Sequence, residues 1–273
     1  MTGASIDQLR TCAARLRAHA IRIAAGRGQG YVGQALGTAE IMSCLFFDAM
    51  RLEGPQEDHD RFVLSPGHYA LTLYAVQLER GLYDPAELET YGMDGSRIEE
   101  SPLEGLPGFE ITGGSLAQGL SQAVGLALGA RLQGRPTHVY CMISDGELQE
   151  GQTWEALLSA AHHGLDNLTI VLDRNRRQVD GSTEEVVSLE PVADKLAAFG
   201  SEVVAVDGHD VAALQTALRR DRITPGKPTA VVARTALGRG VPAFEHADYP
   251  HYLRLPQEQW DAARRLIGVD API

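Results

Sequence analysis

An apolar run that stops abruptly at a polar turn constrains this chain more than any other feature. Residues 137–143 are mostly apolar or β-branched and end in Ser144-Asp145-Gly146-Glu147, a pattern that predicts a buried strand followed by a turn. Residues 152–163 are rich in helix formers, and residues 168–173 are again apolar and β-branched. The three segments predict a strand–helix–strand unit, in which a right-handed crossover lays two parallel strands side by side.

This unit would place oxygen donors at one edge of a sheet. Asp145 follows the first strand and Asn175 the second, so both should emerge at the carboxyl edge, where open α/β sheets bind ligands. A carboxylate and an amide carbonyl are hard donors that suit Mg²⁺ or Ca²⁺, and they leave coordination positions for phosphate oxygens. Gly146 would let the backbone approach the phosphates. The pattern indicates a metal-bound diphosphate site, although an isolated Asp-Gly is most often only a turn.

Size and composition favour a single soluble α/β domain over residues 1–273, with an irregular tail from about residue 241. The 273 residues are 44% hydrophobic and 22% charged, enough to bury a substantial core. The formal net charge of −12 argues against nucleic acid as a partner. No signal peptide or long apolar span is evident, so we expect a cytoplasmic protein that does not contact the membrane.

The remaining pattern alternates helix and strand. The segment 115–132 is rich in glycine and alanine, which permits very close packing inside the molecule or at a subunit contact. The other expected elements are an N-terminal helix ending near Gly26, a glycine-rich loop over residues 26–37, a helix from Thr38, strands at 203–206 and 229–233, and helices at 211–218 and 257–266.

The segment from Ser144 to Gly181, SDGELQEGQTWEALLSAAHHGLDNLTIVLDRNRRQVDG, strongly resembles the thiamine-diphosphate motif of transketolases, which begins Gly-Asp-Gly and closes on an Asn. Three further segments, 61–68, 107–119 and 234–241, are similar to the family's other motifs and occur in the same order. The chain resembles the first, diphosphate-binding domain, as in two-subunit transketolases. The fold implied is a mostly parallel sheet flanked by helices.

The resemblance also implies roles in holding the cofactor. Asp145, Asn175 and the backbone carbonyl of Arg177 would bind Mg²⁺ or Ca²⁺. The residues implied beside thiamine diphosphate are Gly114, Asp145, Gly146, Glu147 and Asn175.

Four residues match catalytic positions of the family. His68 and His251 would face the reacting end of the cofactor and the donor sugar. Glu150 and Glu155 would lie near the subunit contact and relay protons between paired active sites. On spacing alone, the two glutamates are equally well explained as an ordinary charged helix face.

Two departures from the family pattern fall on substrate-facing positions. Tyr31 stands where the family usually has a histidine, and Ser101 stands in place of another. Tyrosine still donates a hydrogen bond, but it does not become a cation near neutral pH. The loss of two ring donors predicts weaker recognition of ordinary sugar hydroxyls and a larger or less polar pocket.

The function implied is that of the cofactor-binding subunit of a two-component transketolase, which moves a two-carbon ketol unit from a ketose donor to an aldehyde-type acceptor. Its partner would be a separate C-terminal subunit carrying the pyrimidine-binding domain, in an α2β2 heterotetramer. The glutamate that activates the cofactor lies in that second domain of the family. We therefore expect this chain to be inactive alone.

Other functions remain open. A specialised ketol or acyl transferase acting on a natural-product acceptor is consistent with Tyr31 and Ser101. A non-catalytic scaffold is a further alternative, against which the intact Asp145, Gly146 and Asn175 argue. A dehydrogenase or decarboxylase of the same cofactor class would share the metal motif, but residues 148–152 are closer to transketolase.

Overall fold

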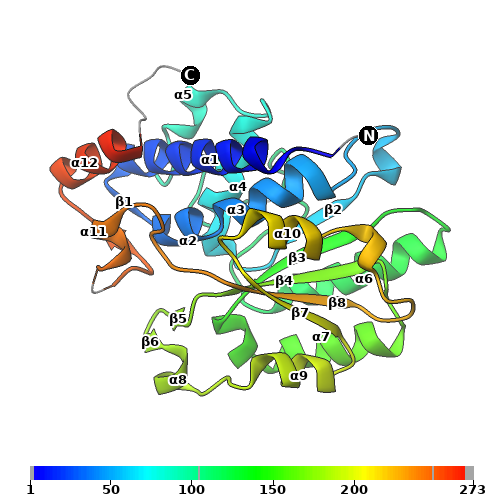
Figure 1. Cartoon of the computed structure of the whole chain (residues 1–273). Helices are drawn as coiled ribbons and strands as arrows, with labels where there is room; N and C mark the ends of the chain where they lie inside the picture. Colours follow the sequence, from blue (N-terminus) through cyan, green and yellow to red (C-terminus); the bar gives the residue numbers. More distant parts are fainter. Residues whose placement is uncertain (1–2, 104, 248, 268–273) are drawn as a thin grey trace.

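A five-stranded parallel sheet forms the centre of the computed structural model, which describes residues 3–103, 105–247 and 249–267 (Figure 1). The strand order is β2-β3-β4-β8-β7, and every neighbouring pair is parallel. The strand bounds are β2 Arg61–Leu64, β3 Val139–Ser144, β4 Leu168–Arg174, β7 Glu202–Asp207 and β8 Thr229–Arg234. The expected mostly parallel sheet flanked by helices is confirmed.

The predicted strand–helix–strand unit is present at the centre of the sheet. Strand β3 leads through a short 3-10 turn into α7 (Gly151–His162), which returns the chain to β4. Strands β3 and β4 pair directly, with Ser144 opposite Asp173 at their carboxyl ends. Every residue of both strands is buried, as in parallel strands covered on both faces.

Helices cover both faces of the sheet. Successive residues of a strand point to opposite faces, so each strand packs against helices on both sides. On one face, Tyr140 and Met142 of β3 pack with residues of α1 (Ile6–Arg27), α3 (Ala39–Cys44), α4 (Ala70–Glu79) and α10 (Val211–Ala217). On the other face, Cys141 and Ile143 pack with residues of α6 (Gln118–Leu132), α7 and α9 (Val192–Ala198). Figure 1 shows α1 and α10 above the sheet and α7 and α9 below it.

The segment expected as a glycine-rich loop is largely structured. It contains the end of α1, β1 (Gln29–Gly30) and α2 (Val32–Gly37). A Cβ on Gly33 would collide with the Pro250 carbonyl oxygen, and one on Gly37 would lie 2.7 Å from that of Ala236. The expectation was wrong because these glycines serve close packing of a helix rather than a turn.

The C-terminal part is also more regular than expected. It forms α11 (Pro242–Glu245), β9 (Leu253–Arg254) and α12 (Gln257–Ile267), and β9 pairs antiparallel with β1. The Trp260 side chain of α12 is fully buried and lies 5.4 Å from the Phe244 ring, centroid to centroid. Burial of this aromatic pair fixes α12, which confirms the helix expected at 257–266, to the domain; α11 and β9 are the part that corrects the expectation of an irregular tail.

Short elements complete the fold. They are α5 (Pro85–Leu88), β5 (Arg177–Gln178), β6 (Gly181–Ser182), α8 (Thr183–Val186), a π-helical turn at Leu45–Ala49, and 3-10 turns at Gln56–Asp58, Gly67–Tyr69, Gly146–Gln149 and Arg220–Arg222. Within the described part of the chain, no helix has both the length and the apolar character needed to cross a membrane.

Candidate active site

A cavity of about 540 Å³ lies at the carboxyl edge of the sheet, beyond the ends of β2, β3 and β4. We call it the edge cavity. Eight of the residues singled out from the sequence line it: Tyr31, His68, Ser101, Gly114, Gly146, Glu150, Arg177 and His251. Because these residues come from distant parts of the chain, only the fold brings them together.

The Asp145 carboxylate is buried at the end of β3, and its two oxygens differ. Oδ2 lies 3.1 Å from a guanidinium nitrogen of Arg174 and accepts a hydrogen bond from the Arg176 amide. Oδ1 is buried and has no hydrogen-bond partner. Burial raises the pKa of Asp145 to about 7, and the nearby Arg174 opposes this rise. A buried carboxylate oxygen without a partner is the feature that a bound cation would explain.

The Asn175 amide is held in one orientation by its neighbours. Its Nδ2 donates to Asp173 Oδ2 at 2.6 Å and to the Tyr69 hydroxyl at 3.2 Å. Since both of these contacts involve the nitrogen, Oδ1 is turned to the other side, where it accepts from the Arg177 amide at 2.9 Å. Asp173 is itself fully buried and also accepts from Tyr69 and Thr235.

The donor set fits a divalent cation that also binds a phosphate group. It comprises one carboxylate, one amide oxygen and one backbone carbonyl, from Asp145, Asn175 and Arg177. Such a set leaves coordination positions for other oxygens. No group of three or more His, Cys, Asp or Glu side chains that could hold a metal occurs among the described residues.

Gly114 and Gly67 bring a second loop against the end of β2. A Cβ on Gly67 would collide with the Gly114 amide nitrogen, so the two backbones touch. Gly114 has φ +127°, and a Cβ there would meet no atom within 4 Å. The conformation requires glycine, and the space beside it is open for a ligand.

Glu147 does not line the edge cavity. Its carboxylate is fully buried and accepts hydrogen bonds from the Ala117 amide at 2.8 Å, from the Ser144 amide at 2.9 Å and from the Ser65 hydroxyl. Ala117 is held at φ +66°, a conformation that non-glycine residues rarely adopt. Glu147 therefore joins the ends of β2 and β3 to the start of α6, and its placement supports the cavity from behind.

An aromatic cluster forms the opposite wall of the edge cavity. The His68 and His251 ring centroids are 5.0 Å apart, and the Tyr31 ring lies 5.1 Å from His68 and 5.8 Å from His251. Burial, together with the neighbouring His251, lowers the pKa of His68 to about 3. Burial lowers the pKa of His251 to about 4. Both imidazoles are therefore neutral at pH 7, and each can donate one hydrogen bond and accept another.

Tyr252 extends this cluster and was not anticipated from the sequence. Its ring lies 4.8 Å from that of Tyr31, and its hydroxyl donates to Glu100 at 3.0 Å. Burial, followed by the charge of Glu100, raises the pKa of Tyr31. Ser101, next to Glu100, lines the same cavity. Tyr252 lies in a loop, and nothing in the local sequence indicates that it would join this cluster.

The two predicted glutamates lie in different places. Glu150 precedes α7 and lines the edge cavity. Glu155 lies on the exposed side of α7 and does not line it. A direct role at the cavity is therefore available to Glu150, while Glu155 could act only through another subunit.

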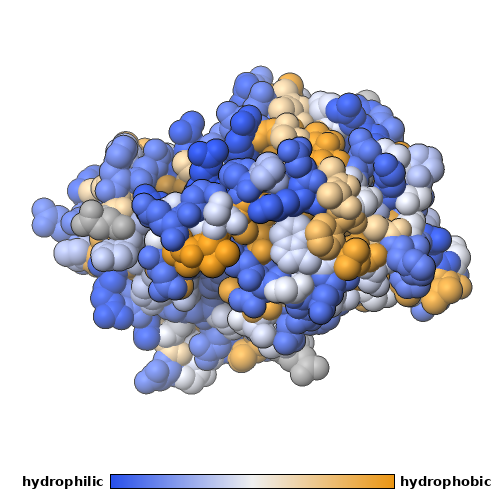
Figure 2. Space-filling model, turned by 90° about the horizontal axis from the view of Figure 1, so that it is seen from below, coloured by the Kyte–Doolittle hydropathy of each residue, from blue (hydrophilic) through white to orange (hydrophobic). Residues whose placement is uncertain are grey.

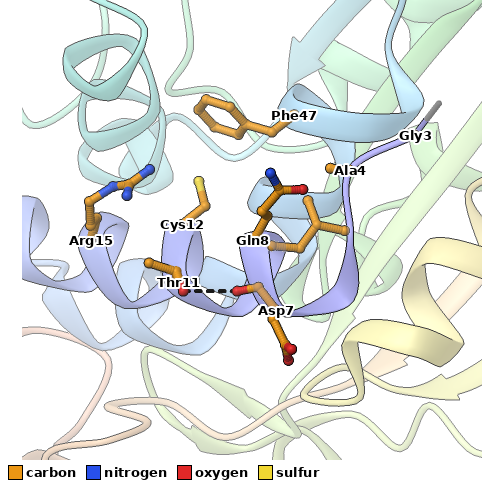
Figure 3. A pocket seen from close by; sticks show the side chains of 9 residues that line it. Gly3, Ala4, Asp7, Gln8, Thr11, Cys12, Arg15 and Phe47 are labelled. Atoms are coloured by element: carbon orange, nitrogen blue, oxygen red, sulfur yellow. Dashed lines mark hydrogen bonds between the residues drawn. The ribbon is translucent and has the colours of Figure 1, made fainter. Parts of the chain in front are cut away.

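A second, larger hollow of about 810 Å³ lies between the first turns of α1 and Phe47. Figure 3 shows Gln8 and Cys12 pointing toward Phe47, while the Asp7 carboxylate points away. Its charged groups do not converge: Asp7 is largely exposed, and Arg15 pairs with Glu79. The edge cavity, with its convergent polar groups, is the better candidate site.

Fold and site together define a class of protein, an α/β domain that binds a phosphate-bearing cofactor at the carboxyl edge of a parallel sheet. Residues 8–272 match the family described as "Transketolase, thiamine diphosphate binding domain". The chain belongs to the transketolase family.

Three relatives are of nearly the same length. The chain is 43% identical to a putative uncharacterized transketolase family protein of Sinorhizobium fredii over 95% of each chain. It is 35% identical to the 6-deoxy-6-sulfo-D-fructose transketolase subunit of a Clostridium species, over 86% of this chain and 87% of the relative. It is 34% identical to one subunit of the apulose-4-phosphate transketolase of Phocaeicola vulgatus, over 88% of this chain and 86% of the relative.

Solved structures agree with the fold. The Leishmania mexicana transketolase superposes with a TM-score of 0.86 at 31% identity, covering 97% of this chain and 42% of that chain.

Longer relatives are matched over only part of their length. Transketolase-like protein 2 of Bos taurus is matched in sequence over 43% of its length, at 39% identity. The chain thus spans less than half the length of these relatives.

Proposed function

We propose that this chain is the cofactor-binding subunit of a two-component transketolase that transfers a two-carbon ketol unit from a ketose donor to an aldehyde-type acceptor. The observation that carries the proposal is the edge cavity, which Arg177 and the neutral histidines line, and which has the partnerless Asp145 Oδ1 buried between the lining residues Ser144 and Gly146. The names of the Clostridium and Phocaeicola relatives, both subunits of transketolases, support it. A cytoplasmic location remains a prediction.

The chain's own residues would hold the diphosphate end of thiamine diphosphate. Oδ1 of Asp145, Oδ1 of Asn175 and the carbonyl of Arg177 would bind Mg²⁺ or Ca²⁺. Gly114 and Gly146 leave room for the diphosphate beside the backbone. When bound, the cofactor supplies the electron sink that ketol transfer requires.

His68 and His251 would act on the substrate. As neutral imidazoles, they can polarise the donor carbonyl and accept or return a hydroxyl proton. Tyr31 packs against both rings and would donate a hydrogen bond from its hydroxyl to the same substrate. Together these groups would orient the donor and exclude water.

Exposed apolar side chains, at the edge cavity and on α6 and α7, support a partner subunit. Val179 and Val186 line the cavity yet are 67% and 41% exposed. Leu126 of α6 and Leu158 of α7 are also exposed, and a Cβ on Gly125 would meet no atom within 4 Å. Figure 2 shows apolar patches interrupting an otherwise hydrophilic face of the molecule. We infer that a subunit carrying the pyrimidine-binding domain covers this region in an α2β2 heterotetramer.

Co-purification with a separate transketolase-type C-terminal subunit, followed by a ketol-transfer assay with thiamine diphosphate and Mg²⁺, tests the proposal. Activity only with both chains present supports it. Asp145→Ala in the complex should abolish Mg²⁺-dependent cofactor binding, and unchanged binding would refute the metal assignment. A complex that never binds cofactor would identify a scaffold instead.

A second candidate is a specialised ketol or acyl transferase with a natural-product acceptor. The observation that favours it is Tyr31 in the cavity wall, packed against the Tyr252 ring, which suits a less polar ligand than a sugar. Cofactor binding and donor cleavage without transfer to sugar aldehydes would favour this candidate.

A further inference from the structure

Arg174 is a buried cation that the proposed chemistry does not use. Its side chain is 2% exposed at the end of β4, and it faces three carboxylates. One guanidinium nitrogen lies 3.1 Å from Asp145 Oδ2. The other lies 3.0 Å from Glu184 and 2.8 Å from Glu190. Such a charged group is retained inside a protein only when its partners are well placed.

The carboxylates belong to two different parts of the site. Asp145 is the proposed cation ligand on β3, whereas Glu184 and Glu190 lie within residues 177–190, which we call the wall segment. The wall segment contains β5, β6 and α8, and it supplies Arg177, Val179 and Val186 to the lining of the edge cavity. Arg174 is therefore a direct physical link between the cation site and one wall of the cavity.

The wall segment has further bonds to this link. The first guanidinium nitrogen also donates to the Thr183 hydroxyl at 3.1 Å. Glu184 accepts from the Ser188 hydroxyl at 2.7 Å and from the amides of Leu189 and Glu190. The hydrogen bond from Ser188, with these amides and Arg174, lowers the pKa of Glu184 to about 2, so it stays ionised. The anchor on Arg174 thus extends through the C-terminal half of the segment.

We propose that Arg174 is a positioning residue that holds the cation ligand Asp145 and anchors the wall of the edge cavity at the same time. By engaging Oδ2 of Asp145, it leaves Oδ1 free to face a cation. By pairing with Glu184 and Glu190, it fixes the position of the wall segment. The cation part deepens the proposed function and rests on it, whereas the anchoring part rests only on contacts within this chain.

The planar fork of arginine is required for this arrangement. It reaches Asp145 from one nitrogen and both glutamates from the other, which a single ammonium group does not reproduce. Arg174→Lys should therefore behave like Arg174→Met in anchoring the wall segment, although it keeps the positive charge.

Limited proteolysis of the full chain, without cofactor or cation, tests the anchoring part. Trypsin cleavage after the exposed Arg176 and Arg177 should be about tenfold faster in Arg174→Met than in the unaltered chain. The double variant Glu184→Gln/Glu190→Gln should show the same acceleration. These two glutamates are partly exposed, so this variant tests the anchor even if Arg174→Met does not fold.

Arg17→Gln is the matched control. The Arg17 side chain is 12% exposed and pairs with Glu40, and Figure 1 shows α1 and α3, which carry them, on the other side of the sheet from β5, β6 and α8. Its removal should lower the stability of the chain without changing cleavage after Arg176. Equal acceleration in this control, or none in the double glutamine variant, would overturn the anchoring role.

Titration of cofactor binding with Mg²⁺, in the complex with the partner subunit, tests the cation part. Arg174→Met should lower the affinity for Mg²⁺ about tenfold or more, because Asp145 loses the partner that orients it. In the double glutamine variant, the affinity for Mg²⁺ should stay within about twofold of that of the unaltered complex. Unchanged Mg²⁺ dependence in a folded Arg174→Met protein would refute this part. Failure of the unaltered complex to bind cofactor would instead refute the proposed function, and the proteolysis result would still stand.

Discussion

The imidazole rings of His68 and His251 lie 5.0 Å apart, centroid to centroid, with an angle of 32° between their planes. One ring follows the second strand of the chain and the other precedes the last, so the fold, rather than local sequence, brings them together. Burial disfavours the charged form of both rings, and the neighbouring His251 adds to this effect at His68. Both rings are therefore neutral at pH 7, the state in which the proposed function uses them.

Acid should destabilise the chain through these histidines. The pKa of His68 in the folded chain is about 3 and that of His251 about 4, and buried His138 is also near 3, all below the ordinary value of about 6.5. The unfolded chain therefore binds more protons between about pH 3 and 6.5. The stability is fully present above pH 6.5 and is lost as the pH falls, by about 1.4 kcal/mol per pH unit for each group.

Urea unfolding at several pH values measures this effect. His68→Asn should reduce the slope of the unfolding free energy against pH near pH 5 by about 1.4 kcal/mol per pH unit, the contribution of one proton. An unchanged slope in His68→Asn would contradict the neutral assignment.

Tyr31 should determine which substrates are accepted. Tyr31→His would add a third imidazole beside His68 and His251, so we expect kcat/KM for sugar-phosphate donors to rise about tenfold, the size of one good hydrogen bond. Tyr31→Phe keeps the ring contacts with His68 and Tyr252 but removes the hydroxyl, so it serves as the control. Equal kinetics in all three proteins would show that this position does not face the substrate.

Asp173 should control cation affinity without touching the cation. It accepts hydrogen bonds from Tyr69, Asn175 and Thr235, and the bond from Asn175 turns that amide oxygen toward the metal side. Asp173→Asn would let the Asn175 amide turn over, because the new side chain at position 173 would carry an N–H donor that the Asn175 amide oxygen can accept. We expect Mg²⁺ affinity in the cofactor-loaded complex to fall by roughly 10- to 100-fold. Calorimetric Mg²⁺ titration measures it, and Thr235→Val, which removes a different donor, should have a smaller effect.

Trp260 should contribute to stability far more than its position near the end of the chain suggests. Its fully buried ring packs on Phe244, so Trp260→Ala should lower the free energy of unfolding by about 3–5 kcal/mol. Leu266→Ala on the same helix removes a side chain that is 59% exposed and should cost about 0.5 kcal/mol or less. Similar losses in the two variants, measured by chemical denaturation, would contradict the packing described for α12.

The sequence allowed the centre of the fold to be predicted because the signals there are local. Buried parallel strands read as continuous apolar runs, and crossover handedness then places Asp145 beside Asn175. The helix expected at 257–266 is present as α12, whereas α2, α11 and β9 were not predicted, because their order depends on contacts with distant backbone, as at Gly33. Arg174 went unnoticed because nothing in its local sequence indicates which carboxylates it will meet.

The residues named from family resemblance fall into two groups. Those that follow strands of the sheet, such as Asp145 and His68, lie where the strand pattern alone would put them. Glu147 and Glu155 do not line the cavity, and spacing along a turn or helix could not have separated them from Glu150. Which side of a helix faces a cavity depends on tertiary packing.

The pairing of β1 with β9 joins only two residues on each side, and Tyr31 and His251 flank this ribbon. The proposed cation ligands Asp145 and Asn175, in contrast, directly follow strands β3 and β4 of the buried central sheet. His68 connects the two parts, because the next residue, Tyr69, donates to Asp173 and accepts from Asn175. A substitution in the ribbon would therefore reshape the part of the wall formed by Tyr31 and His251 while leaving the strand pairing of the sheet as it is.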